Sequence, residues 1–143
     1  MSLAVEVEPA TRWQRLRAPL VTIGSLSAAT LALHLRDPHH SYSWGVCPLS
    51  VAGIYCPGCG GLRAVNDLTN GNVGAAASSN LLAVIGIPIA IVALLAWTIR
   101  GWRGVPQRQM PERLRRLLWM SGAVIALGFT VARNTPAGAW LAP

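Results

Sequence analysis

Three apolar runs without arginine or acidic residues dominate the chain, at residues 18–35, 81–99 and 117–132. An α-helix rises about 1.5 Å per residue, so a hydrocarbon core of about 30 Å needs roughly 20 residues. The second run has this length. Arginines beside the slightly shorter first and third runs can reach the headgroups while their aliphatic stems stay in the apolar layer. The pattern predicts an all-α integral membrane protein with three transmembrane helices.

The segments between these runs complete a single membrane domain over residues 1–143. They are the tails 1–17 and 133–143, the arginine-rich loop 100–116 and the long segment 36–80. In the second run, Pro88 removes one backbone donor, so we expect a bend near residues 82–84. The small residues of 73–80 allow that helix to begin early against a neighbour.

The long segment contains a short amphipathic pattern. Leu62, Val65 and Leu68 recur at helical spacing, and Asn70 followed by glycine is a typical C-terminal stop. We therefore predict a short helix over Gly61–Thr69 that lies against the outer interface of the membrane.

Two charged residues stand four positions apart on this predicted helix, Arg63 and Asp67. In water such an exposed pair contributes little, but against a membrane it can fix how the helix docks. We predict that Arg63 pairs with Asp67 or with a backbone carbonyl of the cysteine loop, which we define as residues 47–60.

Charge gives the chain a direction in the membrane. The net charge is +7, and all twelve basic residues are arginine. Nine of them lie in residues 1–17 and 100–116, whereas only Arg36, Arg63 and Arg133 lie elsewhere. By the positive-inside rule the N-terminus and the second loop are cytoplasmic, and the cysteine loop and C-terminus face outward from a bacterial inner membrane. Arginines at the ends of apolar runs indicate contact with membrane lipids and argue against nucleic acid as a partner.

All candidate chemistry lies in the outward segment, which contains the three cysteines of the chain, Cys47, Cys56 and Cys59. The Cys-x-x-Cys pair resembles a redox dithiol, although no βαβ pattern surrounds it. The same motif resembles a zinc knuckle, with His39 or His40 as the fourth ligand, although structural zinc sites usually pair two knuckles.

A disulfide is the third interpretation, and the one that we favour, because an extracytoplasmic location permits disulfides. We predict that Cys47 bonds to Cys56 or Cys59 and that the remaining thiol is buried and inert. Gly58 and Gly60 are assigned structural roles in the motif. On this interpretation the protein has no catalytic residue, no bound metal and no cofactor, and zinc is the alternative.

The sequence Cys-Pro-Gly-Cys-Gly-Gly-Leu-Arg-Ala, preceded by Cys-Pro and followed by a short helix and an alanine-rich approach to a membrane span, resembles a family of small bacterial membrane proteins. This family is catalogued as domain of unknown function 2752. The resemblance covers about residues 36–97. Leu62 stands where the family usually has threonine, and Leu81 where proline is common. The resemblance implies the topology and no particular activity.

Function follows mainly from what the sequence lacks. It has no ionisable residue in the middle of a span, no cofactor motif and no nucleotide-binding loop. We expect a non-catalytic accessory or assembly subunit of a larger membrane complex. The complex that we consider first is a respiratory oxidase or supercomplex. Arginine without lysine fits an actinobacterial-type genome. The alternative is an extracytoplasmic thiol–disulfide or metal-handling protein that uses the three cysteines.

Overall fold

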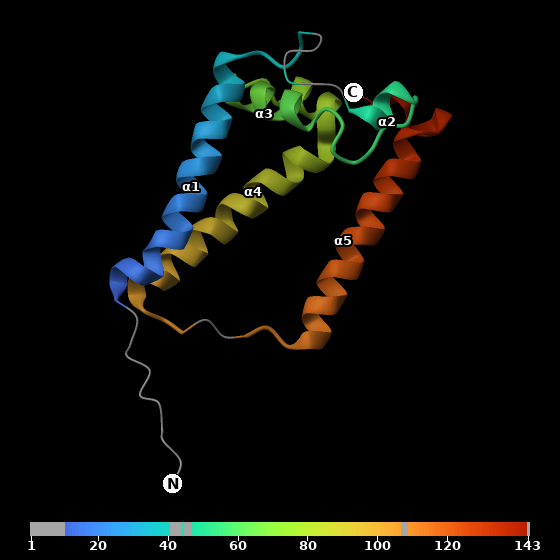
Figure 1. Cartoon of the computed structure of the whole chain (residues 1–143). Helices are drawn as coiled ribbons and strands as arrows, with labels where there is room; N and C mark the ends of the chain where they lie inside the picture. The colour runs from blue at the N-terminus through green and yellow to red at the C-terminus, as the bar shows by residue number, and fades with distance from the viewer. Residues whose placement is uncertain (1–10, 41–43, 45–46, 107–108, 143) are drawn as a thin grey trace.

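The computed structural model describes residues 11–40, 44, 47–106 and 109–142. This part of the chain forms helices and contains no strand. In chain order the elements are α1 (Arg12–Leu35), α2 (Pro48–Val51), α3 (Gly61–Thr69), α4 (Val73–Arg103), α5 (Glu112–Arg133) and the 3-10 helix η1 (Pro136–Leu141) (Figure 1).

Helices α1, α4 and α5 are long and apolar enough to cross a membrane, with 24, 31 and 22 residues. Their apolar side chains face outward from the molecule, as Ile89, Val124 and Leu127 illustrate with exposed fractions of 65%, 68% and 66%. Such an inside-out surface is stable against lipid and costly against water. The prediction of an all-α membrane protein with three transmembrane helices is confirmed.

The first and third helices begin earlier than the apolar runs. Thr11 caps α1 by a capping box, in which the Gln14 amide donates to the Thr11 hydroxyl and the Gln14 side chain accepts from the Thr11 amide. This reciprocal cap satisfies two free backbone donors, so the helix starts in the polar region before the apolar run. Helix α5 likewise begins at Glu112, where a negative charge favours the helix N-terminus.

Helix α4 is broken at Asn80, whose φ of −163° and ψ of 97° are not helical. The Asn80 side-chain oxygen accepts from the Ala83 amide at 2.9 Å, so Asn80 caps the second part of α4. The first part lies in the layer of α3, and the second descends obliquely toward the start of α1 (Figure 1). The break thus precedes the bend expected at residues 82–84, and its cause is Asn80 rather than Pro88.

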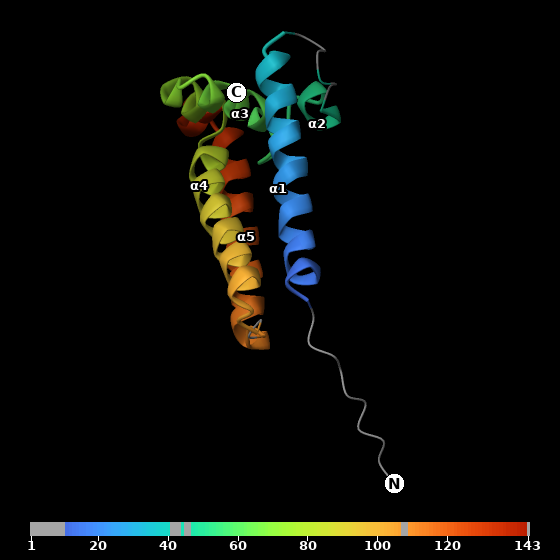
Figure 2. The same cartoon turned by 90° about the vertical axis from the view of Figure 1, so that its left-hand side faces the viewer.

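One end of the molecule joins the start of α1 to the end of α4. The Arg15 Nε donates to the Gly101 carbonyl at 3.2 Å, and the Arg12 guanidinium lies 4.7 Å from the centre of the Trp102 ring. Gly101 permits this approach, because a Cβ there would lie 3.2 Å from the Arg15 carbonyl oxygen. Figure 2 shows α1 and α4 rising from this end.

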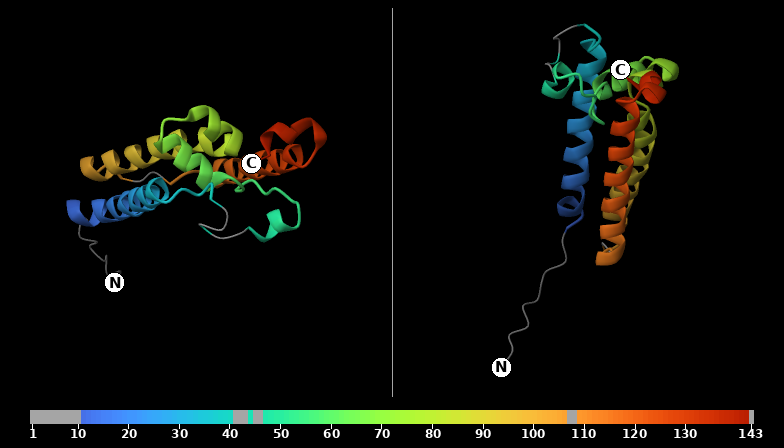
Figure 3. Two further views of the ribbon diagram at one scale, coloured as in Figure 1. Left: turned by 90° about the horizontal axis from the view of Figure 1, so that it is seen from above. Right: turned by 90° about the vertical axis from the view of Figure 1, so that its right-hand side faces the viewer.

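The opposite end holds α2, α3 and η1 (Figures 1 and 2). Helix α3 docks on α1 through Asn66, whose amide donates to the Leu33 carbonyl at 2.7 Å. Seen from above, α3 and the first turns of α4 lie over the centre, while α2 and η1 lie toward α5 (Figure 3). The predicted helix over Gly61–Thr69 is therefore present, and α2, α3 and η1 together form the end that carries the cysteines.

Helix α5 stands apart from the other two long helices in the part of the chain that the structure describes. It packs on η1, which follows it, while α1 packs on α3 and α4 (Figures 1 and 3). Helices α1 and α4 therefore form one packed pair, and α5 diverges from this pair as the other side of an open wedge that is joined through the cysteine end.

Candidate functional site

Two short segments position the three cysteines. Cys47 directly precedes α2, and Cys56 and Cys59 begin and end a tight turn before α3. The Cys59 amide closes this turn by donating to the Cys56 carbonyl at 3.1 Å. Gly60 then has a φ of 75°, a left-handed conformation that glycine adopts without strain, and so turns the chain into α3. This supports the structural role assigned to Gly60.

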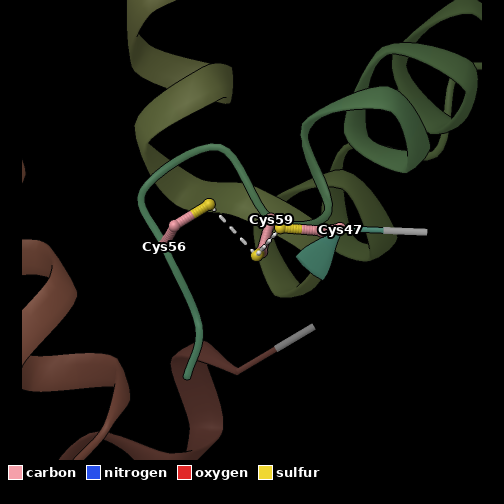
Figure 4. A group of neighbouring side chains, drawn as sticks. All are labelled: Cys47, Cys56 and Cys59. Carbon is pink, nitrogen blue, oxygen red and sulfur yellow. Dashed lines mark hydrogen bonds between the residues drawn. The ribbon is translucent and has the colours of Figure 1, made fainter. Parts of the chain in front are cut away.

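The three sulfur atoms converge on one point (Figure 4). The Sγ atoms of Cys56 and Cys59 are 3.2 Å apart, and those of Cys59 and Cys47 are 3.9 Å apart. All three lie within 4.8 Å of one another. They are free thiols in the structure, so the disulfide between Cys47 and Cys56 or Cys59 stays a prediction. Cys59 is buried and the other two are half-buried.

The environment separates two of these thiols chemically. The backbone N–H groups of Ser50 and Leu49 lower the pKa of the Cys47 thiol, because they stabilise its thiolate. Burial raises the pKa of Cys59 to about 11, and its hydrogen bond with Cys56 adds to this shift. Cys47 is therefore the more readily ionised of the two.

Arg133, the last residue of α5, binds the backbone of the cysteine loop. One terminal nitrogen donates to the carbonyls of Cys56 and Cys59 at 2.9 and 3.1 Å, and the other donates to the Ser79 carbonyl at 3.3 Å. Its Nε donates to the Leu141 carbonyl at 2.8 Å. Arg133 is only 2% exposed. One side chain of α5 thus joins the Cys56–Cys59 turn, the first part of α4 and η1.

Asn80 holds the same turn from α4. Its amide nitrogen donates to the carbonyls of Pro57 and Cys59 at 2.8 and 3.0 Å, and the residue is 2% exposed. Asn134 also binds the cysteine loop. Its side chain donates to the Tyr55 carbonyl at 2.9 Å and accepts from the Tyr55 amide at 3.0 Å. The backbone of the cysteine loop is therefore fixed by side chains from two transmembrane helices and the residue after one of them.

The predicted pairing of Arg63 is wrong. Asp67 instead accepts from the Ser79 hydroxyl at 3.0 Å and lies 3.4 Å from the His39 Nε2. The Arg63 side chain is exposed and makes no hydrogen bond or ion pair with any residue that the structure describes. An arginine does bind the carbonyls of the cysteine loop, but it is Arg133. Asp67 is buried, and its hydrogen bond with Ser79 joins α3 to α4.

His39 does not join the cysteines. Its Nδ1 lies 2.7 Å from Asp37 and its Nε2 faces Asp67, so carboxylates engage both ring nitrogens. The backbone N–H of His39, and then its ring, lower the pKa of the exposed Asp37. Among described residues, the group of side chains able to share a metal ion consists of the three cysteines. The structure thus brings together three of the four residues named for a zinc site. His40, the other candidate, is absent from that group as well.

Sequence reasoning missed Arg133 and Asn80. One signal was available for Arg133, an arginine at the end of a span that the positive-inside rule predicts to face outward, where arginine is disfavoured. Asn80 offered a weaker signal, an amide directly before the longest apolar run. Gly58 shows no close approach, since a Cβ there would meet the Cys56 sulfur only at 3.9 Å.

Together the fold and the cluster define a three-helix membrane protein with a fixed triad of thiols at one end. Residues 47–94 match the model of the family described as Protein of unknown function (DUF2752). The resemblance expected from the motif is confirmed. No curated protein and no solved structure matches the chain. The matched segment includes all three cysteines, α3 and Asn80, whereas Arg133 lies outside it.

Proposed function

We propose that the protein is a non-catalytic accessory or assembly subunit of a larger membrane complex in a bacterial inner membrane. The observation that carries this proposal is the position of α5, which packs on η1 at the cysteine end and is exposed along most of its length. A helix without partners along most of its length has its faces available for a neighbouring transmembrane helix.

The surface of α5 suits close helix packing. Gly122 and Gly128 have no atom within 4 Å of where a Cβ would lie, so both face open space. In membranes, small residues let two helix backbones approach, and van der Waals packing then drives their association. The wedge and these two positions together favour a partner helix against α5.

The proposed orientation places the end with Arg12 and Trp102 in the cytoplasm and the cysteine end outside. Nine of the twelve arginines belong to the segments at the first end, which supports this orientation. Our specific candidate for the host is a respiratory oxidase or supercomplex of an actinobacterial-type membrane.

Affinity purification of the tagged protein in mild detergent tests the proposal. We expect a stoichiometric membrane-protein partner, and haem bands in the reduced-minus-oxidised spectrum if that partner is an oxidase. Gly128→Leu places a bulky side chain on α5 and should reduce the recovered partner several-fold. Leu127→Met changes a neighbouring exposed residue with little change in volume and serves as the matched control. A chain that purifies without a stoichiometric partner, at native abundance, would contradict the proposal.

The alternative, an extracytoplasmic thiol–disulfide or metal-handling protein, has one observation in its favour. The three thiols converge within 4.8 Å of one another, although a structural disulfide needs only two. This alternative can hold whether or not the chain also belongs to a complex.

A further inference from the structure

The convergence of all three sulfurs is the feature that neither an accessory role nor a disulfide explains. A disulfide joins two cysteines and places no demand on a third. Here the third sulfur comes from a separate segment, since Cys47 precedes α2 while Cys56 and Cys59 precede α3. We propose that Cys47, Cys56 and Cys59 bind one thiophilic metal ion, Cu(I) or Zn(II), through three thiolates. This inference is independent of the accessory-subunit proposal.

The sulfur spacing fits a shared metal ion. A metal–sulfur bond of about 2.3 Å puts sulfurs about 3.8 Å apart in a tetrahedral site and about 4.0 Å apart in a trigonal one. The Cys59–Cys47 distance of 3.9 Å agrees with these values, the Cys56–Cys59 distance of 3.2 Å is shorter, and the third sulfur pair lies within 4.8 Å. Soft thiolate ligands favour Cu(I) and Zn(II) over hard cations.

The backbone around the site is fixed without the ion. Arg133 donates to the carbonyls of Cys56 and Cys59, and Asn80 donates to that of Cys59. Side chains from α5 and α4 therefore hold the turn that carries two of the ligands. Hydrogen bonds to the backbone that carries the ligands orient those ligands for the metal. The Arg133 guanidinium also places a positive charge beside a site that becomes negative when three thiolates form.

The described chain supplies three ligands, which complete a trigonal Cu(I) site and leave the fourth position of a tetrahedral Zn(II) site open. Both ring nitrogens of His39 face carboxylates, and no other described histidine or carboxylate joins the cysteines. Cys47 and Cys56 are half-buried, so the ion can be reached from outside. Structural zinc sites are closed by four protein ligands, whereas an open position suits an ion that is exchanged or bound by a fourth, external ligand.

Binding is a substitution at sulfur and involves no redox change. Each Cys S–H bond breaks, each sulfur forms one bond to the ion, and three protons pass to solvent. Cu(I) or Zn(II) keeps its oxidation state throughout. Metal loading must therefore release three protons for each ion bound.

The test uses the full-length protein, purified in detergent under reducing conditions and stripped of metal. Zn(II) is measured by competition with Co(II), whose thiolate charge-transfer band reports sulfur ligation, and Cu(I) by competition with a chromophoric Cu(I) chelator. We expect one ion per chain, three protons released, and protection of all three thiols from alkylation. The affinity ratio of the two arms identifies which ion the site prefers.

Three single variants and two controls complete the experiment. Cys47→Ser, Cys56→Ser and Cys59→Ser should each lower the affinity at least about 100-fold, the upper end of what loss of a second-shell contact costs. His39→Ala and Arg63→Ala should bind like the parent protein. Circular dichroism and gel filtration verify that each variant is folded, and the proton count on the parent protein is independent of any variant.

Several results would overturn the proposal. One is a reduced, folded protein that takes up neither ion, or that binds one and still leaves any of its three thiols open to alkylation. Another is metal binding that Cys47→Ser leaves intact or that His39→Ala abolishes. A protein isolated with a stable disulfide from Cys47 to Cys56 or Cys59 would also exclude the three-thiolate site and confirm the disulfide expected from the sequence.

Discussion

Arg133 shows how one buried cation can be stabilised by neutral groups, since no described acidic residue pairs with it. The guanidinium has five N–H donors in a rigid plane, and it donates to four carbonyls that lie in different directions. It also lies 4.9 Å from the centre of the Phe129 ring, which adds a cation–π contact. These neutral acceptors compensate for the loss of hydration that burial of the charge requires.

Replacing this arginine by lysine tests the multiple contacts. Arg133→Lys keeps the charge but has three donors on one atom, which cannot reach carbonyls on both sides of the guanidinium plane. We expect a loss of about 2–4 kcal/mol in the free energy of unfolding, since hydrogen bonds from a charged group contribute about 1.5–3 kcal/mol each. Thermal unfolding in detergent measures it. Arg63→Lys, at an exposed site without a described contact, should change nothing, and equal melting temperatures for both variants would contradict the role of Arg133.

The thiols offer a second test at this scale. In the metal-free reduced protein we expect Cys47 to be alkylated first as the pH is raised, because its lowered pKa provides thiolate at lower pH. Cys59, with a pKa of about 11, has roughly 0.1% thiolate at pH 8 and is buried, so it should react last. Mass spectrometry after timed alkylation gives the order. Cys59 reacting before Cys47 would contradict the environments described for the two thiols.

Residue roles were the least predictable part of the molecule. The sequence singled out the three cysteines, which the structure brings together, because no other group with their chemistry exists in the chain. It assigned the loop-binding arginine to Arg63, since local spacing suggested a partner four residues away. Arg133 reaches Cys56 from 77 residues along the chain, and a contact between such distant positions leaves no trace in a local pattern.

At the scale of elements, α4 is two helices joined at Asn80. The first part lies beside α3 at the cysteine end, and the second is the apolar segment long enough to cross a membrane. Asn80 makes the junction possible because one amide group caps the second part and binds the cysteine loop. The start of the second apolar run at residue 81 was predictable from hydropathy. The helical segment before it is polar enough to lie outside the span.

Removing the Asn80 amide should affect both parts. Asn80→Ala leaves the Ala83 amide uncapped and removes one donor from each of two loop carbonyls, for an expected cost of about 2–3 kcal/mol. Asn72 is the matched control, since it caps the first part of α4 by accepting from the Ala75 amide and makes no other described side-chain hydrogen bond. Asn72→Ala should cost about 1 kcal/mol.

Thermal unfolding ranks the two variants, and the alkylation rates of the three cysteines report the loop. Faster alkylation is expected for Asn80→Ala alone. If Asn72→Ala destabilised the protein as much and loosened the cysteines equally, Asn80 would be only a helix cap.

At the scale of the whole molecule, the two ends differ in charge and in chemistry. One end of the molecule is rich in arginine, and it contains Arg12, Arg15 and the C-terminal end of α4. The opposite end holds the thiols. Hydropathy and charge were sufficient to predict three spans and which segments share an end, because the bilayer imposes both on any chain. The open wedge was not predictable, since the sequence of a lipid-facing helix says little about which neighbours it contacts.

A pair of fusions tests the proposed orientation. Alkaline phosphatase joined after Ala142 should be active, because the C-terminus lies at the cysteine end and this enzyme folds only outside the cytoplasm. The same reporter joined after Gly104, in the arginine-rich loop, should be inactive. The reverse pattern would place the cysteines in the cytoplasm.

The position of Arg133 also has a consequence for biosynthesis. Cys59 is made 74 residues before the arginine that binds its carbonyl. A ribosome therefore completes the cysteine loop and the first two spans while the side chain that anchors them does not yet exist. Until the last span is inserted, Asn80 of α4 binds the cysteine loop without Arg133. In the proposed orientation, a nascent chain that stalls before this point presents its thiols, less firmly anchored, to the oxidants and thiol enzymes outside the membrane.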